Sequence, residues 1–328
     1  MISAKANALC VLKILEEYSD ENHVLSINEI IQKMGVLYDR KVDRRTVYGA
    51  IETLSDFGYD ILTYNDTGEG YCLTENVFSP AEIRLLIDAI FNCEYISAKQ
   101  TSDLLAKLRS FISVYERSDY NYSKVVKTER KTPNPQIFYN IAALDEAITG
   151  KRKIAFTYCD YDYDKKLKPR REEKDVGSPY VMTCDSGHYY VAAITARHPQ
   201  VTYYRVDMMK DIEVLDEPID ISKRDAGLGT DKKIVYAFSG TPVAIQLHCR
   251  KQALRYVIER FGNDVLIQEN PDGSFDAHFS AAPGGVKLWA LQNLENTEVV
   301  SPESLRQEIT DIIKNSVYLK ETPMMWDM

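Results

Sequence analysis

The spacing of apolar residues changes at Gly150, and this change constrains the fold more than any other feature. Up to Gly150, apolar residues recur every three or four positions, as expected for amphipathic helices. Beyond Gly150 the period falls to two, in short runs separated by polar turns, which is typical of β-strands. The sequence therefore predicts an α+β multidomain protein with a helical first part.

The length of 328 residues suggests two or three domains at roughly 150 residues or fewer each. A polar stretch over residues 117–136 contains Pro133 and Pro135 and lacks apolar periodicity, so we interpret it as a linker. The expected divisions are an N-terminal domain at 1–76, a helical linker region at 77–136, a β-rich domain at 137–220 and a C-terminal domain at 230–328.

Several classes of protein are disfavoured by composition. No apolar run approaches the ~20 residues that span a bilayer, and the N-terminus becomes charged too early for a signal peptide, so we expect a cytoplasmic protein without a membrane partner. The six cysteines show no metal-ligand spacing, and we expect no metal, cofactor or disulfide framework. No nucleophile elbow, phosphate-binding glycine loop or kinase signature occurs, so we expect no enzymatic activity.

Three short helices followed by a hairpin are predicted at the N-terminus. The helices are expected over residues 4–18, from Ser26 to Gly35 and from Asp43 to Gly58, and the strands on either side of a turn at residues 66–70. This order is the pattern of a winged helix-turn-helix.

The segment DRRTVYGAIETLSDFGYDI resembles the recognition helix and first wing strand of winged-helix regulators, whose pattern is roughly S-x-R-T-V-x-R-D-I-x-x-L-x-x-x-G-x-x-I. The matching residues are Arg45, Thr46, Val47, Ile51, Leu54, Gly58 and Ile61. Gly49-Ala50 stands where the family usually has Arg-Asp, which costs about 1 kcal/mol of helix propensity at the glycine and removes one phosphate ligand. The resemblance implies double-stranded DNA as a partner.

The candidate DNA-binding residues lie on or just before the exposed face of the third helix. They are Arg40, Lys41, Arg44, Arg45, Thr46 and Tyr48. Residues 1–76, however, hold seven Lys and Arg against thirteen Asp and Glu, in a chain whose net charge is −9. A structural or protein-binding winged helix is therefore an alternative.

Helices are next expected over residues 80–93 and around 104–112, before the linker. After a helix that ends at Gly150, short strands are expected over residues 153–158, 180–183, 188–194, 201–206 and 211–214, which predicts a small, strongly curved sheet or barrel. From about residue 230 the order of strands and helices predicts a ferredoxin-like βαββαβ unit with an extra C-terminal helix.

The run GHYYVAA at residues 187–193, with PY upstream and YYRVD downstream, resembles the WYL domain, a small Sm/SH3-like β-barrel of bacterial regulators. The family triplet appears as Tyr189-Tyr190-Val191, and Arg205 and Asp207 match two positions of its Arg-Leu-Asp-Arg-Ile pattern. The closing run VKLWALQNLENTEVVSPESLRQEI resembles the C-terminal extension of such regulators. The resemblance implies a transcription regulator whose DNA binding is gated by a ligand.

The middle of the chain also carries an expected ligand site. Eight basic residues and three aspartates lie between Lys151 and Arg171, interleaved with aromatic residues, which suits a phosphate-bearing ligand such as a nucleotide or single-stranded nucleic acid. The candidate ligand-binding residues are Tyr158, Arg170, Arg171, His188, Tyr190 and Arg205. The alternatives are a solvated hairpin, tyrosines of the barrel core, and a structural ion pair between Arg205 and Asp207.

A homodimer is expected, because one winged helix with so few cations gains little from counterion release. A second functional hypothesis is an accessory protein that binds RNA or single strands in a CRISPR-type or other defence system.

Overall fold

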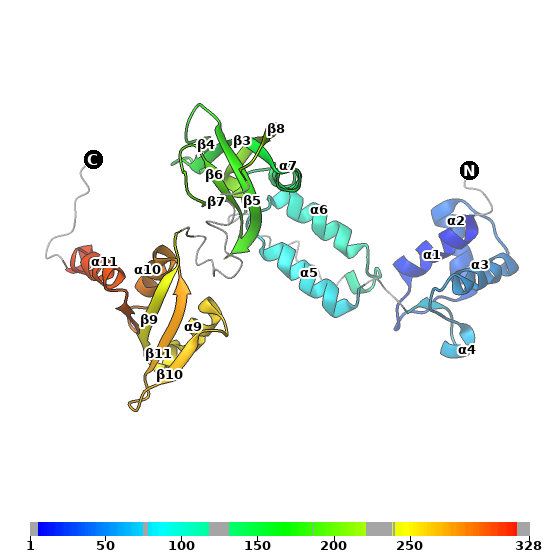
Figure 1. Cartoon of the computed structure of the whole chain (residues 1–328). Coiled ribbons are helices and arrows are strands. Elements are labelled where there is room, and N and C mark those ends of the chain that lie inside the picture. Colours follow the sequence, from blue (N-terminus) through cyan, green and yellow to red (C-terminus); the bar gives the residue numbers. More distant parts are fainter. Residues whose placement is uncertain are drawn as a thin grey trace. The chain divides into compact units, whose positions relative to one another are not determined.

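The computed structural model describes residues 6–74, 78–117, 131–185, 187–220, 238 and 240–319. The chain divides into two compact units, Met1–Thr132 and Pro133–Met328. Figure 1 shows helices in the N-terminal unit and several sheets in the C-terminal one, so the predicted α+β class is confirmed. Among the described residues, no helix is both long and apolar enough to cross a membrane.

The first unit begins with three helices around one apolar core. They are α1 (Asn7–Tyr18), α2 (Ile27–Tyr38) and α3 (Arg44–Asp56), and a two-stranded antiparallel sheet follows, with β1 (Ile61–Leu62) and β2 (Cys72–Leu73). Fully buried side chains from each helix, such as Ile14, Ile30 and Val47, form the core. The capping box of Ser26 with Glu29 and the N-cap at Asp43 are both formed as the sequence predicts.

Two local predictions in this region are wrong. The second helix continues through Gly35 to Tyr38, because Asp39 adopts the left-handed conformation (φ 51°) and its amide donates to the Gly35 carbonyl. The connection between the two strands holds a one-turn helix, α4 (Tyr64–Thr67), rather than only a turn. This helix forms because Thr63 and Asp66 make a capping box at its start.

A helical hairpin completes the first unit. It consists of α5 (Pro80–Asn92), which begins at the predicted cap Ser79, and α6 (Ala98–Arg109), packed through Ile83, Ile87 and Leu105. The segment after α6 returns to the end of α1, where Ser113 Oγ donates to Asp20 Oδ2 at 2.6 Å.

The second unit begins with α7 (Ile137–Thr149), which packs on a curled, six-stranded half-barrel (Figure 1). Its strands are β3 (Arg152–Tyr161), β4 (Leu167–Pro169), β5 (Asp175–Asp185), β6 (His188–Thr195), β7 (Thr202–Arg205) and β8 (Met209–Pro218). Irregular register between β3 and β8 and between β5 and β6 marks bulges, which bend strands and let a small sheet curl. The short strand β4 was not predicted.

Residues 118–130 of the predicted linker lie outside the described residues. Just after them, the side-chain amide of Asn134 is fully buried and donates to the carbonyls of Asp207 (2.8 Å) and Met209 (2.7 Å). The end of the predicted linker is therefore part of the barrel's packing.

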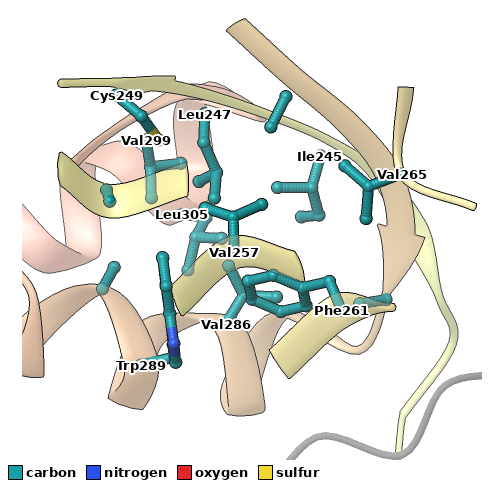
Figure 2. Close-up of a cluster of buried hydrophobic side chains, with 14 of the residues drawn as sticks. Ile245, Leu247, Cys249, Val257, Phe261, Val265, Val286, Trp289, Val299 and Leu305 are labelled. Carbon is teal, nitrogen blue, oxygen red and sulfur yellow. The ribbon is translucent and has the colours of Figure 1, made fainter. Parts of the chain in front are cut away.

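A second, four-stranded antiparallel sheet follows in the order β10-β11-β9-β12. Its elements are β9 (Val243–Cys249), α9 (Leu254–Phe261), β10 (Leu266–Glu269), β11 (Phe275–Ala281), α10 (Pro283–Gln292), β12 (Thr297–Ser301) and α11 (Glu303–Lys314). Figure 2 shows the core between this sheet and its helices, with Leu247, Val257 and Trp289 among its buried side chains.

Candidate functional site

Helix α3 divides into a buried and an exposed face. Val47, Ile51 and Leu54 are at most 5% exposed and pack into the core of the three-helix module. On the opposite face Arg44 and Arg45 are exposed, and the side chain of Tyr48 is 47% exposed. The structure thus brings two guanidinium groups and one aromatic ring to one face of a single helix.

The Arg44 and Tyr48 side chains on this face each contact a neighbouring residue. Arg44 Nη2 donates to Asn28 Oδ1 at 3.1 Å, and the Tyr48 ring centroid lies 6.4 Å from that of Tyr71. A groove of about 190 Å³ lies between α3 and the β1–β2 connection. Its lining residues are Ser26, Ile27, Asn28, Arg44, Tyr48, Tyr64, Glu69, Gly70 and Tyr71.

Three other predicted DNA-binding residues have different environments. Thr46 is half-buried, and both its amide (2.8 Å) and its hydroxyl (2.7 Å) donate to Asp43 Oδ1, so its side chain serves the helix cap. These bonds lower the pKa of Asp43. Arg40 is half-buried with its amide bonded to the Met34 carbonyl, and Lys41 is exposed just before the helix.

In the barrel, Tyr158 and Arg170 lie together. The Arg170 guanidinium carbon lies 4.8 Å from the centroid of the Tyr158 ring, within cation–π range. Tyr158 also contacts the ring of Tyr204, and its hydroxyl accepts the Arg205 backbone N–H at 3.3 Å. Burial raises the pKa of Tyr158, although the hydrogen bond from Arg205 opposes that shift.

Tyr190 and Arg205 are direct partners across β6 and β7, so their side chains share one face of the sheet. The His188 ring meets the Tyr190 ring edge-on, with centroids 6.4 Å apart. Arg205 Nε and Nη2 donate to the two carboxylate oxygens of Asp207 at 3.1 and 2.7 Å. Burial disfavours the charged form of Arg205, but the bonds to Asp207 outweigh it and raise the Arg205 pKa.

Arg171 belongs to a different cluster. Its Nη1 lies 3.5 Å from Asp175 Oδ1, and Arg197 Nε lies 3.2 Å from the same oxygen. The sequence-based site did not include Arg197, because its position in the β6–β7 loop gives no periodic signal. Only the fold, which pairs β5 with β6, brings this loop beside Asp175.

The basic character predicted for residues 151–171 is largely balanced by acids. Lys168 pairs with Asp162, and Arg170 Nη2 lies 2.9 Å from Asp160 Oδ2. Two more partners come from β8, outside that stretch: Lys153 pairs with Glu217 at 2.8 Å and Arg152 with Asp216 at 3.6 Å. Counting eight basic residues against three aspartates along the chain therefore overstates the positive charge of this surface.

Within the described residues, no group of three or more His, Cys, Asp or Glu side chains is arranged to hold a metal ion. Guanidinium groups and aromatic rings are the side-chain groups that contact phosphates and bases in nucleic-acid-binding proteins.

Two known domain families match the second unit of the chain. Residues 139–214 match the WYL domain and residues 241–317 match the WCX domain. The chain thus carries a WYL domain followed by a WCX domain. The predicted resemblance to WYL-domain transcription regulators with a C-terminal extension is confirmed.

One curated protein matches most of the chain. The chain is 24% identical over 315 residues to the uncharacterized HTH-type transcriptional regulator YobV of Bacillus subtilis (strain 168), covering 86% of this chain and 91% of that protein. Together with the two domains, this match supports a WYL-domain transcriptional regulator.

Two solved structures show more distant likeness. The proteasome accessory factor B/C (PafBC) of Arthrobacter aurescens is 16% identical with a TM-score of 0.27; the match covers 98% of this chain but 49% of that one, so this chain spans about half its length. The crystal structure of a CRISPR Cas-related protein is 11% identical with a TM-score of 0.36, covering 73% of each chain.

Proposed function

We propose that this protein is a transcription regulator that binds duplex DNA through the exposed face of α3. The observation that carries the proposal is the division of α3 into a buried apolar face and an exposed face with Arg44, Arg45 and Tyr48. A helix of this kind fits the major groove, where arginine can bind a guanine edge through two hydrogen bonds. The HTH-type regulator among the relatives supports the same function.

We also propose a type of fold for each domain of the chain. Three helices followed by β1 and β2 support a winged helix-turn-helix at residues 1–76, with a helical linker region at 77–136. The sheet at residues 137–220 supports an Sm/SH3-like sensor barrel. The strand order β10-β11-β9-β12, with α9 and α10 as crossovers, supports a ferredoxin-like unit at 230–328.

DNA binding is tested by replacing Arg45, which is exposed and carries no part of the core. Arg45→Ala should weaken binding by about 1 to 3 kcal/mol at one base position if Arg45 reads a base, and should weaken all sequences alike if it contacts phosphate. The measurement is a gel shift on genomic fragments at low salt. Absence of any specific complex with the wild-type protein would overturn the proposal.

For the barrel, we propose that it holds a phosphate-bearing ligand, a nucleotide or short single strand, which gates DNA binding. Two pairs of side chains support this: Arg170 over the Tyr158 ring, and Arg205 beside Tyr190 on one face of the sheet. Arginine supplies charge for phosphate, and tyrosine rings are side chains on which bases stack. His188, whose ring meets that of Tyr190, and Arg171, which lies in the cluster of Asp175 and Arg197, are further candidate contacts.

The ligand proposal predicts two different effects on salt dependence. Arg205→Ala should lower affinity for a short oligonucleotide and flatten the dependence of affinity on salt, because one ionic contact is lost. Tyr190→Ala should lower affinity by about 1 to 3 kcal/mol per stacked base and leave the salt slope nearly unchanged. If the wild-type chain binds no nucleotide or oligonucleotide at low salt, Arg205 is a structural partner of Asp207.

A further inference from the structure

Gly49 lies in the middle of α3, on its exposed face, and nothing in the described protein requires a glycine there. A Cβ built on Gly49 would have no heavy atom within 4 Å. Its backbone belongs to a regular helix, whereas Gly58 and Gly68 have positive φ and Gly70 would meet the Leu25 carbonyl at 2.5 Å. Gly49 thus differs from glycines that the fold itself needs.

A glycine inside a helix is unfavourable relative to alanine, because it loses more backbone freedom on folding. In the described part of the chain, no atom comes close enough to Gly49 to require that its side chain be missing. A partner molecule that approaches α3 closely at position 49 would explain the glycine there.

The neighbours of Gly49 indicate what that partner is. Arg45 lies one turn before Gly49 and Glu52 nearly one turn after it, so both border the same surface of the helix, and both are exposed. Tyr48 flanks the position with a ring that is 47% exposed. Long side chains with hydrogen-bonding ends therefore flank a position that carries no side chain.

We propose that Gly49 is a specificity-determining position, at which the missing side chain lets a base edge of duplex DNA reach the helix backbone. A helix with its side chains is about 10–12 Å across and the major groove is about 12 Å wide, so one side chain decides how deeply the helix sits. This inference rests on the proposed function, because it assumes that α3 enters the groove.

The test separates helix stability from DNA binding. Gly49→Ala should raise the thermal midpoint by roughly 2–4 °C, because alanine favours the helix. The same variant should bind the wild-type site about tenfold or more weakly, because the added methyl holds the helix away from the base. The probe is a duplex selected by the full-length wild-type protein from a random 40-base-pair library.

Gly35→Ala is the matched control. Gly35 also lies inside a helix, α2, and its Cβ would make only an ordinary contact with the Arg40 carbonyl at 3.8 Å. This variant should gain stability in the same way and keep wild-type affinity for the selected duplex.

The outcomes distinguish the two proposals. If wild-type protein binds the duplex and Arg45→Ala weakens the complex, but Gly49→Ala binds as tightly as wild type, the role of Gly49 is refuted and DNA binding through α3 stands. If both alanine replacements of glycine weaken binding equally, the effect comes from helix stiffness and the role of Gly49 is also refuted. If the library yields no bound duplex, both proposals fail.

Discussion

At the scale of single residues, the ion pair of Arg205 and Asp207 combines a partly exposed cation with a buried anion. The Arg205 side chain is 29% exposed, whereas that of Asp207 is 1% exposed. Removing the cation leaves a buried carboxylate without its two charged donors. Arg205→Ala should therefore lower the free energy of unfolding by about 1–3 kcal/mol, measured by urea denaturation. Arg205→Lys should lose less of this free energy. If Arg205→Ala leaves the free energy of unfolding unchanged, the ion pair does not stabilise the fold, and its only remaining role is in ligand binding.

Asp20 gives a pH dependence with a definite sign. Burial acts to raise its pKa, but bonds from the Ser113 hydroxyl, the His23 ring and the Asn22 amide outweigh burial, so the pKa is lowered. A carboxylate with a lowered folded pKa adds stability above its unfolded pKa, and that stability is lost as pH falls through the folded value. Urea unfolding of the first unit within the full chain should thus show a loss on acidification that Asp20→Asn reduces. Equal acid sensitivity in both proteins would refute this role.

The six thiols should differ in reactivity according to burial. Burial raises the pKa of Cys249 to about 12 and its side chain is fully enclosed, so almost no thiolate is present at neutral pH. Cys184 is exposed on β5. Alkylation followed by mass spectrometry should label Cys184 in the native protein and Cys249 only after unfolding. Labelling of Cys249 at the native rate of Cys184 would contradict the packing of the second sheet.

At the scale of elements, the caps of the helices were predictable because they depend on residues within one turn. Ser26 with Glu29, Asp43 and Ser79 with Glu82 all act as the local sequence indicates. The end of α2 was not predictable, since a left-handed Asp39 replaced the expected glycine stop. The strand β4 was missed because only pairing with β3 makes three residues a strand.

The cap of α3 leads to a prediction at the same scale. Asp43→Ala removes the acceptor for the Thr46 amide and hydroxyl, and should lower the free energy of unfolding by about 0.5–2 kcal/mol. Asp43→Ser, which keeps an N-cap acceptor, should retain most of the free energy of unfolding that Asp43→Ala loses. Thermal unfolding of the two variants measures the difference, and equal losses would show that the cap does not hold the start of α3.

For the whole molecule, the candidate ligand site was harder to predict than the candidate DNA-binding face. The residues of α3 share one helix, so periodicity alone places Arg44, Arg45 and Tyr48 together. The barrel site depends on pairing between strands far apart in sequence. This pairing joins Tyr190 to Arg205 and brings acids of β8 beside basic residues of β3, a balance that no count along the chain contains.

We expect the whole protein to form a homodimer, because the N-terminal module carries more acids than bases and one copy gains too little affinity for DNA from phosphate contacts alone. Two linked copies gain affinity through effective concentration, and their binding site should hold two half-sites one or more helical turns apart. Light scattering at tens of micromolar should report a dimer. A monomer both with and without DNA would contradict this expectation.

The proposed binding of duplex DNA by the exposed face of α3 is tested by a quantitative binding titration. Fluorescence anisotropy on the duplex selected by the wild-type protein should show saturable binding that weakens as salt rises. The double variant Arg44→Ala with Arg45→Ala should weaken binding and reduce the salt slope, because two cations are removed from one face while the buried residues of α3 are unchanged. Equal affinity and an equal salt slope for the two proteins would contradict the proposal.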